Sequence, residues 1–485
     1  LNYALAPVDA RDALTPPGPD SPPEDVDRFL RNVRGYHALN LAIHLLAGLA
    51  LFGVVRRSLL APSLRLRFGT SSTLLAFLIA VAWLLHPVNT ESVTYVVQRV
   101  ESLMGLFYLA TLYCAIRAAE AGPRARWWVG GAVVACALGM GSKETMVTAP
   151  GMVVLWDLLI GRADSGSAGD ILRRRWLLYA GLAVTWAILG ILSAASPRSQ
   201  SAGFGLGDWT WWSYLRTQAG VVAHYLRLAL VPTPLVFDYE WPRAGSLGEV
   251  APHALLLVSL IIGAGAAAWR RHPLGFAGAW FFLILAPTSS ILPIPTEVAA
   301  EHRMYLPIAA VAALVILGLH GTARRVLAGR DGKAGAAHPI AWSLVLVVGV
   351  AIAATFGVMT HARNAVYHSN EALMRDTVEK RPQNIRARVA LGADLLAARR
   401  FAEAEAELGV AVRLEGSDKA RAQAHMHLGS SLCAQGRVAE GVAHLNQALA
   451  LDSTLAEAHA LLGEAYASQG QLAAAATHFK QAVVG

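Results

Sequence analysis

Acidic, basic and histidine side chains gather in three short stretches, each at the end of a long apolar run. The stretches cover residues 86–101, 142–144 and 301–305. A carboxylate in such a place can accept a proton from a reacting hydroxyl, and a cation there can bind a phosphate group. The candidate catalytic carboxylates are Glu91 and Glu301, and the candidate substrate ligands are His86, Arg99, Lys143, Glu144, His302, Arg303 and Tyr305.

Two of the cations also have a purely structural interpretation. Arg303 can pair with Glu301 or Glu297, and Lys143 can pair with its neighbour Glu144. No group of carboxylates, histidines or cysteines in the sequence has the spacing of metal ligands. The sequence therefore predicts no metal site, and it indicates no cofactor.

The elements that must position these side chains are predicted to be membrane-spanning helices. The chain of 485 residues is 55% hydrophobic and only 15% charged, whereas globular chains are roughly 25% charged. This composition excludes a disordered chain, a disulfide scaffold and a simple cytosolic fold. It predicts an all-α protein with a polytopic membrane core, because several apolar runs approach the roughly 20 residues that cross a bilayer. The predicted spans are Tyr36–Val55, Ser72–Leu85, Leu103–Ala118, Trp127–Gly139, Thr145–Ile160, Trp176–Ala195, Ala254–Trp269, Leu274–Ala286, Tyr305–Leu319 and Ile340–Met359.

Charge in the loops predicts the orientation of the spans. Arginines outnumber acidic residues in alternate loops, which places those loops in the cytoplasm and the three candidate stretches and the C-terminal tail on the other side. The alternation requires that Tyr214–Val231, whose polar residues recur along one stripe, lies at the interface or re-enters without crossing. The net charge of +8 is then a sign of topology, and no nucleic-acid partner is predicted. The arginine-rich loops are 56–67, 117–126, 162–175, 270–271 and 324–333.

The C-terminal residues 384–485 are predicted to form three tetratricopeptide repeats. Gly392, Gly429 and Gly463 are 37 and 34 residues apart, and 34 is the period of this repeat. A large apolar residue follows each glycine at the same interval, as stacked helix pairs require. Three repeats are about the minimum for a stable stack. Such an array binds a peptide or a partner protein in its groove, or it serves as a rigid spacer or a dimerisation arm. The large residues are Leu408, Leu445 and Phe479.

Several strings of residues resemble one family of membrane proteins. Together with the repeats, they are similar to the transmembrane and tetratricopeptide-repeat (TMTC-type) proteins, which resemble protein O-mannosyltransferases of the GT-C class. The resemblance covers nearly the whole chain, and the string that begins at Glu301 is its most specific part. The strings are Gly35-Tyr36-His37 with Asn40 and His44, His86-Pro87 with Thr90-Glu91 and Tyr95, Ser142-Lys143-Glu144, and Glu301-His302-Arg303-Met304-Tyr305-Leu306-Pro307.

The resemblance implies a membrane glycosyltransferase. Its donor would be a polyprenyl-phosphate-linked sugar, mannose by resemblance, and its acceptors would be Ser and Thr hydroxyls of exported proteins held by the repeat groove. Enzymes of this class place an acidic motif in the first outer loop after the first span. The sequence begins after that point, so we expect a fragment whose catalytic base lies in the preceding region.

Two alternatives stay open. An oligosaccharide ligase that uses a lipid-diphosphate-linked glycan would need several arginines, and Arg216, Arg227 and Arg243 are the ones to consider. A membrane-anchored repeat scaffold without catalytic activity would not need charged residues at the lipid boundary. The expected organisation is a Pro-rich outer loop at 1–35, a glycosyltransferase-like membrane core at 36–360, a linker helix at 361–383 and the repeats at 384–485.

Overall fold

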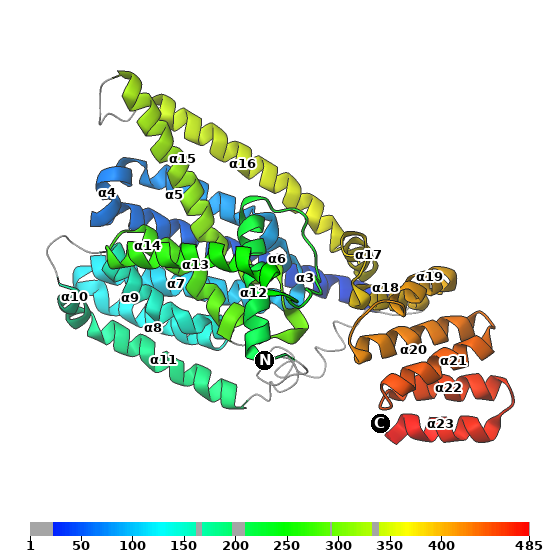
Figure 1. The fold of residues 1–485 in the computed structure, drawn as a ribbon. Helices are drawn as coiled ribbons and strands as arrows, with labels where there is room; N and C mark the ends of the chain where they lie inside the picture. The colour runs from blue at the N-terminus through cyan, green and yellow to red at the C-terminus, as the bar shows by residue number, and fades with distance from the viewer. Residues whose placement is uncertain (1–22, 162–166, 196–208, 292, 332–338, 485) are drawn as a thin grey trace. The chain divides into compact units, whose positions relative to one another are not determined.

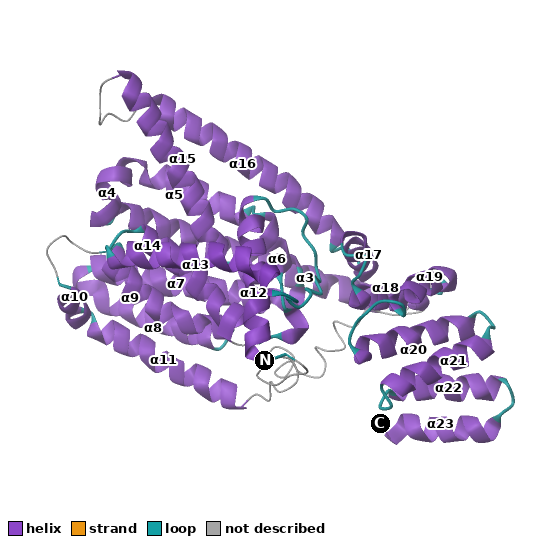
Figure 2. Ribbon diagram, in the orientation of Figure 1, coloured by secondary structure: helices purple, strands orange, loops and turns teal. Residues whose placement is uncertain are grey.

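The computed structural model describes residues 23–161, 167–195, 209–291, 293–331 and 339–484, and all regular structure in these ranges is helical (Figures 1 and 2). Apolar helices come first and repeat helices follow, so the all-α prediction is confirmed. The chain divides into two compact units. The core unit holds 242–364 and the chain before residue 236, and the repeat unit holds 236–241 and 365–485.

The core unit is a set of fourteen helices within the described residues. Seven of its helical segments are long and apolar enough to cross a membrane: 34–60, 62–84, 96–120, 176–195, 247–269, 307–326 and 342–366. The helices are α3 (Pro23–Leu60), α4 (Pro62–Phe68), α5 (Ser72–Leu84), α6 (Thr90–Thr94), α7 (Arg99–Glu120), α8 (Ala125–Met140), α9 (Ala149–Leu159), α10 (Ala168–Arg174), α11 (Trp176–Ala195), α12 (Trp211–Leu230), α13 (Leu247–Trp269), α14 (Leu274–Ala286), α15 (Pro307–Asp331) and α16 (Pro339–Val366).

The surface of the core unit is apolar in the way that a lipid environment requires. Along α13, Leu255, Ile262 and Trp269 are 71%, 65% and 89% exposed. A continuous apolar face of this kind is unfavourable in water and marks a membrane contact. The core unit is that of a multi-pass membrane protein.

Three of the ten predicted spans form helices shorter than a bilayer crossing. α8, α9 and α14 contain 16, 11 and 13 residues, so the longest of them extends only about 24 Å at 1.5 Å per residue. α9 is preceded by a tighter helical turn at Glu144–Thr148, and α14 is followed by a wider one at Pro287–Ile291. The first of these turns contains Glu144 of the second candidate stretch. The other turn leads into the third stretch.

The prediction of a loop throughout 1–35 is wrong for its second half. α3 begins at Pro23 and continues through the first membrane segment without a break. Proline lacks an amide hydrogen, which the first turn of a helix does not need, so it is well suited to the start of a helix. The prolines before Pro23 lie outside the described residues.

The structure also divides the predicted linker helix differently. Residues 361–366 continue α16, and α17 (Asn370–Lys380) is part of the repeat unit. Leu373 and Met374 of α17 are buried in the same apolar cluster as Leu391 and Leu395 of the first repeat. The physical reason is that α17 has an apolar face, which an exposed linker would leave in water.

The repeat unit contains three further helix pairs in its described part. The glycine that anchors each repeat lies where the two helices of a pair cross. A Cβ atom at Gly392 would stand 2.4 Å from Leu408, and one at Gly463 would stand 2.6 Å from Phe479, so only glycine lets these helices approach so closely. The pairs are α18 (Ile385–Ala397) with α19 (Phe401–Ala411), α20 (Asp418–Ala434) with α21 (Val438–Leu451), and α22 (Ala456–Ser468) with α23 (Leu472–Val484).

A short segment from far earlier in the chain completes the repeat unit. Residues 236–241 belong to the connection between α12 and α13, yet their contacts are with the repeats. Asp238 forms an ion pair with Arg386, and the backbone amide of Ile385 donates a 2.7 Å hydrogen bond to the Glu240 carboxylate. The Asn384 side chain donates a 2.8 Å hydrogen bond to the Asp238 carbonyl.

Candidate functional site

The three candidate stretches converge at one end of the core helices. The turn Pro87–Asn89 and α6 pack against the turn Glu301–Met304, and α7 packs against the turn Glu144–Thr148. Each stretch connects one apolar helix to the next. The core helices thus bring together three connections that lie far apart in the sequence.

Glu91 and His302 form the centre of this site. His302 Nδ1 lies 2.7 Å from Glu91 Oε1, and the His302 amide donates a 3.1 Å hydrogen bond to Glu91 Oε2. Both side chains are buried. Burial raises the pKa of Glu91 to about 7, although the His302 amide and the nearby Arg363, Lys143 and Arg303 oppose the rise.

His302 is neutral in this environment. Burial and the neighbouring Lys143 lower the pKa of His302 to about 4. When Glu91 is ionised, a neutral ring donates its Nδ1 hydrogen to the carboxylate and leaves Nε2 as an acceptor. That Nε2 atom lies 3.8 Å from the carboxylate of Glu297, whose side chain is 52% exposed. The three groups form a line from the buried interior to the surface.

Lys143 lies beside this line, paired with a carboxylate that the sequence analysis did not select. Its ammonium group forms an ion pair with Glu101 of α7, rather than with the adjacent Glu144. Glu144 is half-buried at the start of the following turn. Burial lowers the pKa of Lys143, but Glu101 and Glu144 raise it more strongly, so its pKa stands above the ordinary value and the group stays charged.

Arg303 is buried and bonded to backbone. Its guanidinium donates to the carbonyls of Thr288 and Val298, at 3.3 Å each, and to that of Glu297. These carbonyls belong to the connection between α14 and the turn that carries His302. In this structure Arg303 therefore holds that connection, and whether it also binds a substrate stays a prediction.

Polar side chains of α12 hold the same connection from its other side. Tyr214 donates to the Thr288 carbonyl at 2.9 Å, and Gln218 donates to the Val298 carbonyl at 2.8 Å. Tyr225 accepts a 2.8 Å hydrogen bond from the Ala300 amide. Of the polar stripe seen in the sequence, Gln218 thus faces the protein and holds the segment before the turn at 301–304, whereas Arg227 is exposed.

Glu301 pairs with a residue that the sequence analysis missed. Its carboxylate is buried and lies 3.8 Å from the guanidinium of Arg363, near the end of α16. Arg363 follows an apolar span on the side that carries few arginines. An arginine in that position needs a carboxylate partner. Its place after the apolar span could therefore have identified Arg363 from the sequence.

The remaining candidates surround this centre. Tyr305 is fully buried, and its hydroxyl lies 2.8 Å from His44 Nδ1. His86 is buried with Nε2 3.3 Å from the Ala229 carbonyl, and burial lowers its pKa to about 4. Arg99 is directed toward the start of the first span, where its Nε donates a 2.6 Å hydrogen bond to Asn40. His302, Lys143 and Arg303 are close enough to influence one another electrostatically.

Among the described residues, no group of three or more His, Cys, Asp and Glu side chains is arranged to hold a metal ion. The arrangement instead combines a buried carboxylate–imidazole pair with two ion pairs and a buried arginine. Such a set can accept a proton at the imidazole and can stabilise an anion with the lysine.

Comparisons with known proteins gave two matches. Residues 429–470 match the model of the TPR repeat family. A curated protein matches a larger part of the chain. The chain is similar to protein O-mannosyl-transferase TMTC1 of Homo sapiens.

The two sequences are 23% identical over 400 residues, which is 72% of this chain and 42% of TMTC1. The match therefore spans less than half the length of the human protein. It supports the resemblance to the TMTC-type proteins that the sequence strings indicate, and the repeats at the C-terminus are confirmed.

Proposed function

We propose that this protein is a membrane glycosyltransferase that moves a sugar, mannose by its similarity to TMTC1, from a polyprenyl phosphate to Ser or Thr hydroxyls of exported proteins. The observation that carries the proposal is the pairing of buried Glu91 with His302 beside the Lys143–Glu101 ion pair. A protein that only anchors its repeats has no need for charged groups buried at a membrane boundary, where they cost free energy.

The reaction requires one bond to form and one to break at the anomeric carbon of the sugar. The acceptor oxygen attacks this carbon, the bond to the phosphate oxygen breaks, and polyprenyl phosphate leaves with the bonding electrons. Attack from the face opposite the phosphate inverts the anomeric centre. The hydroxyl proton must go to a base on the protein, and the phosphate must be stabilised by a cation.

The site supplies both groups. His302 Nε2, with Glu91 bonded to the other ring nitrogen, is placed to take the proton toward the exposed Glu297. Lys143 is the cation that we assign to the phosphate, because the Arg303 guanidinium is engaged by three carbonyls.

An apolar cavity beside His86 suits the lipid tail of such a donor. Its volume is about 400 Å³, and its walls come from α5, α15 and α16. His86 packs edge-on against Phe356 at 4.6 Å between ring centroids, at the end of the cavity nearest the turns of the site. An isoprenoid chain needs an apolar channel of this kind, while its phosphate stays with the cations.

Two of the three arginines that a diphosphate-dependent ligase would need are engaged elsewhere. Arg227 donates to the Thr233 carbonyl at 2.5 Å, and Arg243 lies over the Trp209 ring at 4.4 Å. Arg216 stands eleven positions from Arg227 on α12, about 16 Å along the helix axis. We therefore favour the monophosphate donor. The repeats, by the usual property of such arrays, would present the acceptor protein.

The proposal is tested by transfer from radiolabelled polyprenyl-phosphate mannose to acceptor peptides, with the full-length protein in membranes. We expect Lys143→Met to lower the rate by about 10²–10³-fold, as the loss of one stabilising charge does. Arg243→Gln is the matched control and should transfer normally under this donor. Incorporation by a Lys143→Met protein at the wild-type rate contradicts the assignment of Lys143.

A double variant separates catalysis from folding. Lys143→Met alone leaves Glu101 buried without its partner, which destabilises a protein. Lys143→Met with Glu101→Leu removes both charges and should restore the folded protein without restoring transfer. Full recovery of activity in the double variant would show that the pair is only structural. Absence of transfer by the wild type from any polyprenyl-phosphate sugar would favour the scaffold.

A further inference from the structure

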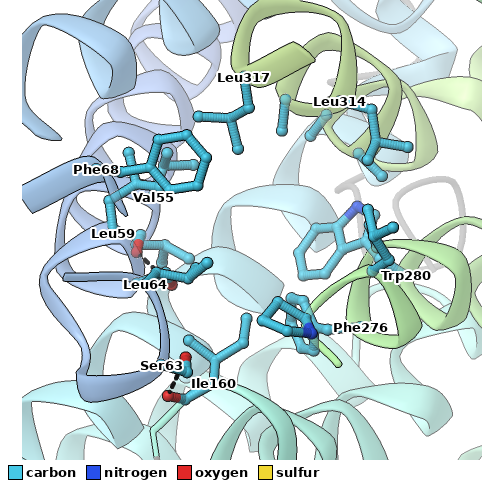
Figure 3. Close-up of a pocket in the computed structure, with 18 of the residues that line it drawn as sticks. Val55, Leu59, Ser63, Leu64, Phe68, Ile160, Phe276, Trp280, Leu314 and Leu317 are labelled. Atoms are coloured by element: carbon cyan, nitrogen blue, oxygen red, sulfur yellow. Dashed lines mark hydrogen bonds between the residues drawn. The ribbon is translucent and has the colours of Figure 1, made fainter. Parts of the chain in front are cut away.

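A second apolar cavity lies in the core unit, at the opposite end of the helices from Glu91 and His302. Its volume is about 430 Å³, and Figure 3 shows the residues that line it. On α3 the site contacts involve residues 40–44 and the cavity involves 51–59. On α15 the site adjoins the first residue, whereas the cavity extends along the helix from Ala309 to Gly318. The cavity therefore lies toward the ends that carry the arginine-rich loops.

The inner wall of the cavity is apolar. Its few polar side chains are hydrogen-bonded to other protein groups. Ser58 donates to the Val54 carbonyl and accepts from Trp156, and Ser63 donates to the Ile160 carbonyl, each at 2.8 Å. Trp280, whose ring forms one side of the cavity in Figure 3, donates to the Leu306 carbonyl at 2.8 Å. A chain of methylene groups is the chemistry that such a wall accepts.

The cavity reaches the lipid-facing surface. Leu274 and Leu314, on α14 and α15, line it and are 53% and 43% exposed. The labelled apolar side chains in Figure 3 point into the same space from helices on different sides. A lipid chain can thus enter from the bilayer between α14 and α15 without crossing water.

The charged side chain of the cavity is a cation at its end. Arg67 lines the cavity from α4, is exposed, and lies with its guanidinium over the Phe68 ring at 5.0 Å. Its backbone carbonyl accepts a 2.8 Å hydrogen bond from Arg324, which brings a second cation to this end. His272 also lines the cavity. An occupant with an apolar chain and an anionic headgroup fits this cavity. The chain would contact the apolar wall, and the headgroup would pair with the arginine.

We propose that this cavity is a binding site for one chain of an anionic phospholipid, whose phosphate headgroup pairs with Arg67 in the leaflet opposite to the Glu91–His302 site. The site is separate from the transfer reaction proposed above, since none of its lining residues belongs to that site. It gives the core unit a selective lipid contact between α3, α4, α14 and α15.

Lipid retention by the purified full-length protein tests the proposal. The protein is reconstituted in bilayers that contain equal amounts of phosphatidylglycerol and phosphatidylcholine, re-extracted in mild detergent, and examined by native mass spectrometry. We expect phosphatidylglycerol to be retained in preference. Arg67→Gln should reduce this preference by about fivefold, the effect of one basic residue beside anionic lipid. Arg65→Gln removes an exposed arginine of the same helix that does not line the cavity, and it should leave the preference unchanged.

Filling the cavity gives an independent test that does not depend on charge. A side chain added at Gly318 meets no atom within 4 Å of its Cβ, so Gly318→Phe should fold and occupy the space of the lipid chain. Gly190→Phe on α11 is equally unobstructed and serves as the control. Gly318→Phe should abolish retention of phosphatidylglycerol, and Gly190→Phe should not.

Three results would overturn the proposal. These are equal retention of the two phospholipids by the wild type, the same loss for Arg65→Gln as for Arg67→Gln, and unchanged retention in Gly318→Phe. A polyprenyl phosphate retained in place of phospholipid, and lost in Gly318→Phe, would also overturn it by assigning the cavity to another lipid.

Discussion

The imidazole of His302 meets two carboxylates, one buried and one at the surface, and this arrangement decides how the site responds to pH. Glu91 is the group that titrates near neutrality, because burial raises its pKa to about 7, whereas the pKa of His302 falls to about 4. Between these values His302 is neutral while Glu91 is largely protonated. The pair becomes competent to accept a proton only when Glu91 ionises.

We predict that the transfer rate at low substrate concentration rises with pH, with a midpoint near 7. The raised pKa of Glu91 means that the ionised carboxylate forms only above this value. Glu91→Gln should lower the rate by about 10²–10⁴-fold, the usual contribution of general base catalysis. It should also remove the rising limb. The measurement is the pH profile of kcat/KM for both proteins. A Glu91→Gln profile that keeps the same midpoint would assign the limb to another group.

Two histidine pairs recur at equivalent positions of successive repeats. His425 and His444 lie 3.0 Å apart between their Nδ1 atoms, and His459 and His478 lie 3.1 Å apart. Burial and the facing histidine lower the pKa of His425, and the same two causes lower that of His478. Each pair joins the two helices of one repeat.

We predict that the repeats lose stability as the pH falls below about 6.5, the ordinary pKa of histidine. A histidine whose pKa is lowered by folding binds protons more readily when unfolded, so its stabilising effect is present above 6.5 and is lost in acid. Hydrogen–deuterium exchange of α20–α23 in the whole protein, between pH 8 and pH 5, measures this effect after correction for intrinsic exchange rates. Replacing His425 and His478 by Gln should flatten the response, and His368→Gln should not. Equal acid sensitivity in all three proteins would contradict the prediction.

The sequence predicted which charged residues lie near one another better than it predicted their ion-pair partners. Glu91, Lys143, His302 and Arg303 do come together, as their types and places at the ends of apolar runs indicated. Lys143 pairs with Glu101 because two helices place them side by side. Adjacency in the sequence favoured Glu144 as the partner of Lys143. It could not reveal the contact with Glu101, which depends on how the helices pack.

At the scale of elements, the apolar runs predicted where helices form, but they could not predict where each helix stops. The runs at Trp127, Thr145 and Leu274 form the short helices α8, α9 and α14. Their ends are set by turns whose backbone is held by other helices. The carbonyls after α14, for example, are bonded to Tyr214 and Gln218 of α12.

The glycines of the repeats were predictable for a different reason. Their spacing repeats, and the helix crossing that requires them repeats with it. We predict that Gly463→Val destabilises α22 and α23 by about 1–3 kcal/mol, the usual cost of overpacking. The new Cβ would stand 2.6 Å from Phe479.

Gly409→Val is the matched control, since the nearest atom to its Cβ would be 3.9 Å away. The opening free energies of α22 and α23 from hydrogen exchange in the whole protein give the comparison. Equal values for Gly463→Val and Gly409→Val would show that the crossing tolerates a side chain.

At the scale of the whole molecule, the segment 236–241 bears on topology. It joins α12 to α13 and belongs to the repeat unit, so we expect the repeats and that connection to share one side of the membrane. We predict that single cysteines at Ser246 and Gly416, in a protein without its native cysteines, react with an impermeant maleimide from the same side. A cysteine at Arg124 should react only from the other side. Labelling of Ser246 and Gly416 from opposite sides would contradict this arrangement.

The segment 236–241 also has a consequence for how the protein is made. The ribosome delivers Asp238 and Glu240 well before Asn384 and Arg386, which hold them in the finished molecule. Chains fold largely from the N-terminus as they emerge. The connection after α12 must therefore stay without its partners while four further helices are inserted, and only the arrival of the first repeat completes it. A nascent chain arrested before α18 would leave this connection open to a protease or a chaperone.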